Sequence, residues 1–113
     1  MYVNRGDLGI PHSVVVDTTH PLLITSAGHY RLHAVPQMRT HRPDGREDYL
    51  LLYVAGGVMR CVVDSEEQTL EKGTAVLFRP REEQDFCASA EEKSEYYWCH
   101  FTGAEVEAVL AEV

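Results

Sequence analysis

Six histidines are the residues of this chain with the most obvious potential for metal chemistry. Ligands that approach one metal ion from the same β-strand must stand two residues apart to face the same interior. Only His29 and His33 come near that spacing. At four residues apart in a strand they would lie about 13 Å from each other, too far to share an ion. The spacing therefore favours structural or surface histidines, and we expect no metal and no other cofactor.

The sequence gives little support to nucleophilic catalysis. The three cysteines, Cys61, Cys87 and Cys99, are odd in number and widely spaced, which is typical of reduced structural thiols. No GxSxG motif is present. Cys99 precedes His100, but adjacent residues of a strand face opposite ways, so the two are poorly placed to form a dyad.

Aromatic residues and one arginine are better candidates for a binding site. Rings with a polar edge suit stacking on a sugar-like ligand, although aromatic strand residues commonly pack in a core. The rings on expected strands are Tyr49, Tyr53, Phe86, Tyr96, Tyr97 and Trp98. Arg42 precedes Pro43 where a strand meets a turn, so its guanidinium could offer paired donors to ligand oxygens. Pocket lining and core packing both remain open for the rings.

The elements that must position these side chains are predicted to be short β-strands. Residues 29–34 alternate, with Tyr30 and Leu32 on one face. The apolar runs 49–54 and 58–63 flank two glycines and predict a hairpin. Further strands are expected around 68–70, 75–78, 85–88 and 96–101, with turns at 64–65, 72–73 and 90–93. Short strands at such regular spacing predict an antiparallel barrel or sandwich.

The two ends of the chain differ from this pattern. Residues 1–20 read as an arm with an edge strand near residues 14–16. Near the other end, Thr102 and Glu105 form a capping-box pattern. An apolar stripe at helical spacing follows, formed by Val106, Val109, Leu110 and Val113. No stop signal ends this helix, so we expect the natural polypeptide to continue beyond it.

Length and charge narrow the class of protein. The chain has 113 residues, which suits one domain, and its formal charge is −8. This acidity disfavours direct binding to nucleic acid or to an anionic membrane. No apolar run is long enough for a membrane-spanning helix and no secretory signal is evident, so we expect a soluble, cytoplasmic protein.

Three segments occur in an order and spacing that resemble one known family. They are RPDGREDYLLLYVAGG at residues 42–57, LEKGTAVLFRPREEQ at residues 70–84 and YYWCHFTG at residues 96–103. Together they resemble the N-terminal effector-binding domain of AraC-type transcriptional regulators. The resemblance implies an all-β, cupin-like double-stranded β barrel (a jelly roll), with an N-terminal arm and the start of a C-terminal α-helix.

Domain boundaries and partners follow from the same resemblance. It implies an arm at residues 1–20, the effector-binding barrel at residues 21–103, and at residues 104–113 the start of a helix that precedes a DNA-binding domain. We therefore expect a homodimer that binds a small-molecule effector and contacts DNA only through that further domain. An acidic fragment is compatible with this role because the basic half would lie elsewhere.

The resemblance also bears on the metal. The second motif of metal-binding cupins has Pro, Gly and a ligand His where this chain has Arg79, Arg81 and Gln84, although Gly73 is kept. The first motif is likewise not recognisable near residues 43–50. The chain is therefore expected to be a barrel that keeps the pocket and has lost the metal.

Four residues match positions that contact the effector in sugar-responsive members of the family. They are Arg42, Phe86, Tyr96 and Trp98. We expect Arg42 to hydrogen-bond the ligand while Phe86 and Trp98 stack on it, and residues 1–20 to be the element that moves. The implied function is non-catalytic sensing of a sugar-like small molecule.

Two other classes of function stay open. One is a metal-dependent cupin isomerase or dioxygenase, with ligands drawn from His29, His33, His41 and His100. The other is an interaction module that holds a partner through its acidic surface and terminal helix. Stoichiometric metal would favour the enzyme, and a basic helical extension would favour the regulator.

Overall fold

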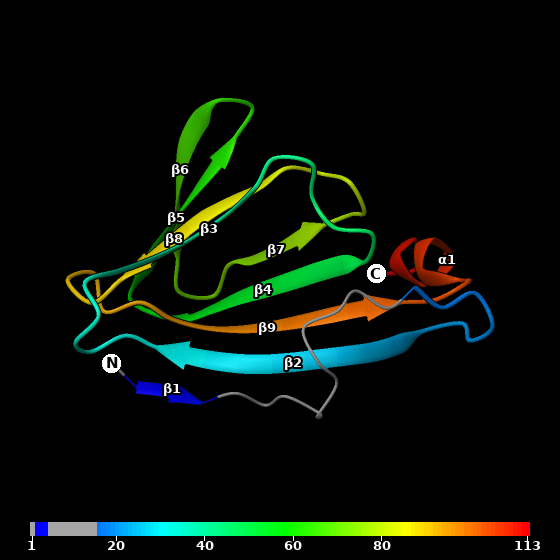
Figure 1. Cartoon of the computed structure of the whole chain (residues 1–113), viewed down its shortest axis with the longest axis horizontal. Coiled ribbons are helices and arrows are strands. Elements are labelled where there is room, and N and C mark those ends of the chain that lie inside the picture. Colours follow the sequence, from blue (N-terminus) through cyan, green and yellow to red (C-terminus); the bar gives the residue numbers. More distant parts are fainter. Residues whose placement is uncertain (1, 5–15) are drawn as a thin grey trace.

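The computed structural model describes residues 2–4 and 16–113. These residues form nine β-strands and one short helix (Figure 1). The strands are β1 (Tyr2–Asn4), β2 (Leu23–Arg31), β3 (Gln37–Arg42), β4 (Tyr49–Gly56), β5 (Val58–Val63), β6 (Glu66–Glu71), β7 (Ala75–Phe78), β8 (Gln84–Ser89) and β9 (Glu95–Thr102). The helix is α1 (Val106–Leu110).

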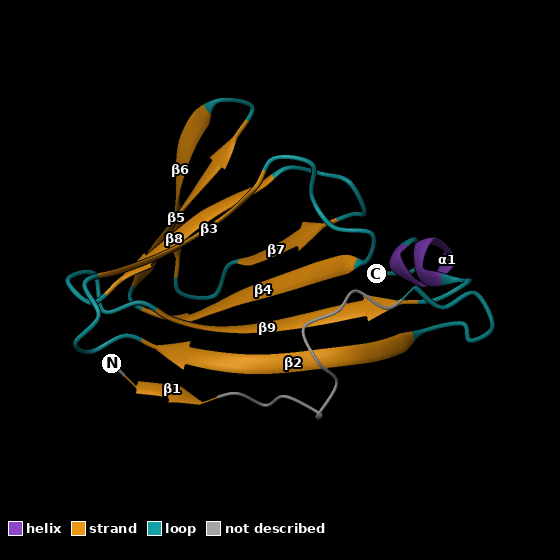
Figure 2. Ribbon diagram, viewed as in Figure 1, coloured by secondary structure: helices purple, strands orange, loops and turns teal. Residues whose placement is uncertain are grey.

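The strands form two antiparallel sheets that enclose one core. The first sheet has the order β1-β2-β9-β4-β7 and the second has the order β3-β8-β5-β6. Figure 2 shows the two sheets as separate layers, with α1 beside the ends of β4 and β9. The predicted all-β fold, an antiparallel barrel or sandwich, is confirmed.

Alternation along the strands builds the core. On β4 the even-numbered residues Leu50, Leu52 and Val54 are buried, whereas Leu51 and Tyr53 are exposed. The registers place the even-numbered residues of β9 beside them, since Leu52 pairs with Trp98 and Val54 with Tyr96. On the facing sheet, the inward residues include Met59, Cys61, Phe86 and Ala88. Burial of these apolar side chains is the main force that holds the sheets together.

The hairpin expected across residues 49–63 is not formed. β4 pairs with β7 and β9, whereas β5 pairs with β6 and β8 in the other sheet. Gly57, at φ +60, carries the chain from one sheet to the other, and a Cβ there would lie 2.3 Å from the carbonyl oxygen of Glu92. The glycines therefore mark a crossing between sheets. The hairpin in this region joins β5 to β6 through Asp64 and Ser65.

The strand expected at residues 29–34 lies earlier in the chain. β2 ends at Arg31, and Gly28 lies within it. Gly28 is opposite Trp98. The indole occupies the space that a side chain at Gly28 would need, because a Cβ there would lie 2.4 Å from Cζ2 of Trp98. A glycine that looks like a strand boundary is thus required for packing inside the strand.

We predict that Gly28→Ala destabilises the domain by about 1–3 kcal/mol, because an added methyl group must displace the indole. The measurement is urea unfolding followed by the fluorescence of Trp98, the single tryptophan of the chain. Gly56→Ala is the control, since its Cβ would meet the Glu95 side chain at longer distances, 3.1 Å from Oε1 and 3.3 Å from Cβ. Equal losses in the two variants would show that close packing at Gly28 is not the cause.

The C-terminal helix begins later than the capping pattern predicts. Thr102 is the last residue of β9, and its hydroxyl accepts a hydrogen bond from the Asp17 backbone N–H at 3.3 Å. Glu105 occupies the N-cap position without a side-chain capping bond. The expected capping box is therefore wrong, because Thr102 is held in strand pairing with Leu23. In the expected apolar stripe, Val106 is buried, whereas Val109 and Val113 are exposed.

The arm contributes an edge strand near its beginning, a strand that was not predicted from the sequence. β1 pairs with the outer edge of β2, with Asn4 opposite His29. The strand expected near residues 14–16 falls mainly on residues outside those described, and Val16 is not in a strand.

Across the described residues, no helix is both long and apolar enough to cross a membrane.

Candidate functional site

Polar side chains gather inside the barrel, where both sheets contribute inward-facing residues. We call this group the interior polar cluster. Its members are Arg42, Arg46, Asp48, Gln84, Trp98 and His100. Arg42 on β3 pairs with Gln84 on β8, and Trp98 and His100 alternate on β9. The loop between β3 and β4 adds Arg46 and Asp48.

A buried ion pair anchors one side of the cluster. Arg46 donates from Nε and Nη2 to the two carboxylate oxygens of Asp48, at 2.7 and 3.0 Å. The Asp48 side chain is fully buried and that of Arg46 is 14% exposed. Two parallel, charge-assisted hydrogen bonds fix both groups, so each charge is neutralised by the other.

Arg42 and Gln84 hold each other on the facing sheet. Nη1 of Arg42 donates to Oε1 of Gln84 at 2.8 Å. Because a guanidinium has no acceptor, this contact fixes the orientation of the amide. The amide nitrogen Nε2 of Gln84 is then buried with no hydrogen-bond partner among the described residues. Burial and the nearby charge of Arg46 lower the pKa of Arg42.

Two further polar atoms of β9 lack partners. Nε1 of Trp98 and Nδ1 of His100 are buried without a hydrogen bond to any described residue. The nearest carboxylate oxygen to Nδ1 belongs to Asp48, at 3.8 Å, which is too long for a hydrogen bond. Burial, helped by the charges of Arg46 and Arg42, lowers the pKa of His100 to about 4. The imidazole is therefore neutral near pH 7.

The structure brings all four predicted site residues to the inward face, in two different settings. Arg42 and Trp98 belong to the interior polar cluster. Phe86 and Tyr96 are 5% and 3% exposed and pack in the core, where Phe86 lies 5.8 Å from the ring of Phe78. Contact between any of the four residues and a ligand stays a prediction.

The four histidines of the enzyme alternative are not brought together. His29 faces outward from β2 and hydrogen-bonds Glu95, His33 lies exposed after β2, and His41 faces outward from β3 beside Glu83. Only His100 faces inward. Gln84, where the resemblance aligned a ligand histidine, supplies an amide, and no group of three or more metal-ligating side chains occurs in the part of the chain described. The donor set of the interior thus does not fit a metal ion.

Two of the three cysteines, Cys61 and Cys99, do not offer an activated nucleophile. All three are free, with Cys61 buried and Cys87 and Cys99 partly buried. Burial raises the pKa values of the Cys61 and Cys99 thiols. A raised pKa favours the unreactive thiol form.

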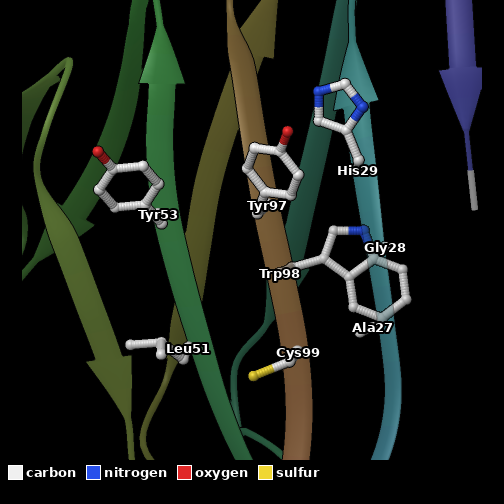
Figure 3. Close-up of a pocket in the computed structure, with 8 residues that line it drawn as sticks. All are labelled: Ala27, Gly28, His29, Leu51, Tyr53, Tyr97, Trp98 and Cys99. Carbon is white, nitrogen blue, oxygen red and sulfur yellow. The ribbon is translucent and has the colours of Figure 1, made fainter. Parts of the chain in front are cut away.

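A pocket that was not predicted from the sequence lies on the outer face of the first sheet (Figure 3). Its volume is about 430 Å³. The register aligns Tyr53, Tyr97 and His29 in one row across three strands, and Leu51, Cys99 and Ala27 in the next. His29 stacks on Tyr97 with ring centroids 4.5 Å apart. The alternation of residues on β4 and β9 would have predicted this outward-facing group of side chains if the pairing of the strands had been known.

The sequence of the chain matches one protein family over residues 26–113, and that family is described as the AraC-like ligand binding domain. This match covers most of the chain. The chain belongs to the AraC-like ligand binding domain family. No curated protein gives a significant match.

Solved structures similar to this AraC-like domain share its fold at low sequence identity. A Cupin 2 conserved barrel domain protein from Salinispora arenicola is 13% identical, with a TM-score of 0.55, covering 98% of this chain and 83% of that one. KdgF from Halomonas sp. is 16% identical, with a TM-score of 0.52 and coverages of 78% and 76%. These likenesses show the cupin barrel fold.

A transcriptional regulator is also among the similar structures. An HTH_3 family regulator from Vibrio cholerae is 14% identical, with a TM-score of 0.51 over 71% of this chain. The AraC-like domain spans only 50% of the length of that regulator. This likeness, too, shows the barrel fold.

Several residues of the interior polar cluster of the AraC-like domain were not predicted from the sequence to line a binding site. Gln84 was considered only as a lost metal ligand, and His100 only as a metal ligand or as a dyad partner of Cys99. Arg46 and Asp48 were not considered. Alternation with Phe86 on β8 and with Trp98 on β9 could have placed Gln84 and His100 inward. The burial of Arg46 and Asp48 in a loop has no such periodic signal.

Proposed function

We propose that this domain senses a small, oxygen-rich molecule of carbohydrate-like character, which binds at the interior polar cluster without being chemically converted. The observation that carries this proposal is the set of three buried polar atoms without partners, on Gln84, Trp98 and His100. Buried polar groups are normally hydrogen-bonded, so orphaned ones beside a half-buried arginine indicate a site for a polar guest.

The family and the chemistry of the interior support the same function. Ligand binding is the property that names the AraC-like family. Inward-facing Tyr30 and Trp98 stack with centroids 6.2 Å apart, so flat rings lie beside the polar atoms. Rings with nearby donors suit a molecule that has both apolar faces and oxygen-bearing edges.

The wider role we propose is regulation of transcription. The acidic domain would bind its effector as part of a cytoplasmic homodimer, while a separate basic domain of the full protein contacts DNA. The effector must bind two states of the regulator with different affinities to change its activity. The Vibrio cholerae regulator, in which a similar barrel is part of a longer transcriptional regulator, supports this arrangement.

A ligand panel tests the proposed function. The domain is titrated with aldoses, polyols and sugar acids while the emission of Trp98 and the melting temperature are recorded. We expect a saturable response to at least one compound. Affinity should fall about tenfold or more in Arg42→Gln, because hydrogen bonds to a charged group are lost. The ligand should be recovered unchanged after prolonged incubation.

Tyr97→Ala provides the matched control, because Tyr97 lies on the outer face, is 50% exposed and lines the pocket of Figure 3. Its affinity for the ligand should equal that of the unmodified domain. The opposite pattern, with affinity lost in Tyr97→Ala and kept in Arg42→Gln, would assign binding to the outer pocket and refute the interior site.

A further inference from the structure

We propose that the effector carries a carboxylate group, and that Arg42 with the neighbouring N–H donors of Gln84 and Trp98 binds it. This inference rests on the proposed function, and it adds the charge of the ligand. It identifies the effector as a small hydroxy acid, such as a sugar acid, in place of a neutral sugar. Three separate observations lead to it.

The first observation is the balance of charge in the cluster. Arg46 and Asp48 neutralise each other, and His100 is neutral near pH 7. Arg42 forms no ion pair with any described residue, and its hydrogen-bond partner is the uncharged amide of Gln84. The cluster therefore holds one positive charge without a counterion. Burying an unpaired charge is costly, and an anionic guest removes that cost.

The second observation is the polarity of the unpartnered atoms. Two of the three, Nε2 of Gln84 and Nε1 of Trp98, are N–H donors that lack an acceptor among the described residues. The guanidinium of Arg42 also has only donors, and one bond to Gln84 leaves others available. A neutral sugar hydroxyl brings a donor hydrogen along with its lone pairs. A carboxylate brings acceptors alone, and it fits the planar fork of an arginine.

The third observation is the arrangement of the donors on two facing sheets. Gln84 is fully buried and lies beside Arg42 on the second sheet, whereas Trp98 belongs to the first. The rings of Trp98 and His100 lie 5.4 Å apart, and the charge of Arg42 is close enough to lower the pKa of His100. The donors of the cluster thus come from both sheets. Arg42 is only half-buried, so part of this residue is accessible from solvent.

Acetate and acetamide are a suitable pair of probes, because they have the same shape and differ in charge. Each is titrated into the domain at constant ionic strength while the single indole N–H resonance of Trp98 is followed by ¹⁵N-¹H NMR. We expect acetate to shift this resonance saturably, with a dissociation constant in the millimolar range for so small a ligand. Acetamide should bind at least about tenfold more weakly, because it carries no negative charge and cannot form an ion pair with the guanidinium.

Two variants test whether the response to acetate depends on Arg42. Arg42→Gln should abolish the acetate shift, and Arg42→Lys should restore part of it by keeping the charge. Arg39→Gln is the control, since Arg39 lies on the same strand but pairs with Asp85 on the outer side, at 2.8 Å. That variant should respond to acetate as the unmodified domain does.

The possible outcomes separate this inference from the proposed function. Three results would refute the proposal that Arg42 binds a carboxylate of the effector. They are an equal response to both probes, no response to acetate, and an acetate response that survives in Arg42→Gln. If a neutral sugar still binds in an Arg42-dependent manner, the proposed function stands and only the charge of the effector is wrong. If every binding ligand instead depends on Tyr97, both proposals fail.

Discussion

Arg46→Met is expected to destabilise the domain by about 3–5 kcal/mol at pH 7, because it leaves the Asp48 carboxylate buried without its counterion. The Asp48 side chain is fully buried, and both of its oxygens accept hydrogen bonds from Arg46. Domains of this size are stable by only about 5–15 kcal/mol, so the variant should be partly unfolded at physiological temperature. Urea unfolding followed by far-ultraviolet circular dichroism measures the loss.

A double variant identifies the cause of that loss. Arg46→Met combined with Asp48→Leu removes both charges, and it should recover most of the stability, since an apolar pair can replace a buried ion pair. Arg79→Met is the comparison at the surface, where Arg79 and Glu107 are both about half exposed and lie 3.1 Å apart. It should change stability little. A double variant no more stable than Arg46→Met alone would show that the unpaired carboxylate is not the cause.

Acid should weaken the domain through His100. The pKa of His100 is lowered to about 4 in the folded protein by burial and by Arg46 and Arg42. An unfolded histidine binds its proton below about pH 6.5, so unfolding takes up a proton between about pH 6.5 and 4. The free energy of unfolding should therefore fall as the pH drops through this range. Between pH 7 and 5 the contribution of His100 is about 2 kcal/mol.

His100→Gln isolates this contribution because glutamine does not titrate. Urea unfolding of both proteins at several pH values from 7 to 5 gives the difference in stability at each pH. The unmodified domain should lose about 2 kcal/mol relative to the variant over that range. Acidic groups such as Asp85 and Glu92, whose pKa values are lowered by Arg39 and Arg60, are present in both proteins and cancel. Parallel pH profiles would refute the role of His100.

These two predictions and the carboxylate inference depend on one electrostatic arrangement. Arg46 forms an ion pair with Asp48, and both arginines favour neutral His100, which leaves the charge of Arg42 without a counterion among the described residues. Removing Asp48 alone would add a second unmatched positive charge. Ligand binding should therefore be tested in variants that keep Arg46 and Asp48 intact.

The sequence by itself determined the all-β class and most of the strands. Residues 75–78 form a strand as expected, and β8 and β9 extend only a residue or so beyond the predicted ranges. Local geometry explains this success, because side chains alternate with period two and glycine or Asp-Ser pairs favour turns. The three family segments likewise identified the AraC-like domain that residues 26–113 match.

Only the tertiary structure decided which strands pair and which inward residues meet. The runs at residues 49–54 and 58–63 look like a hairpin, yet they belong to different sheets. Gly28 looks like a boundary, yet it accommodates the indole of a residue seventy positions away. Strand pairing and charge compensation depend on contacts between distant segments, which local periodicity does not encode. The unmatched charge of Arg42 appears for that reason only when Arg46, Asp48 and His100 are placed around it.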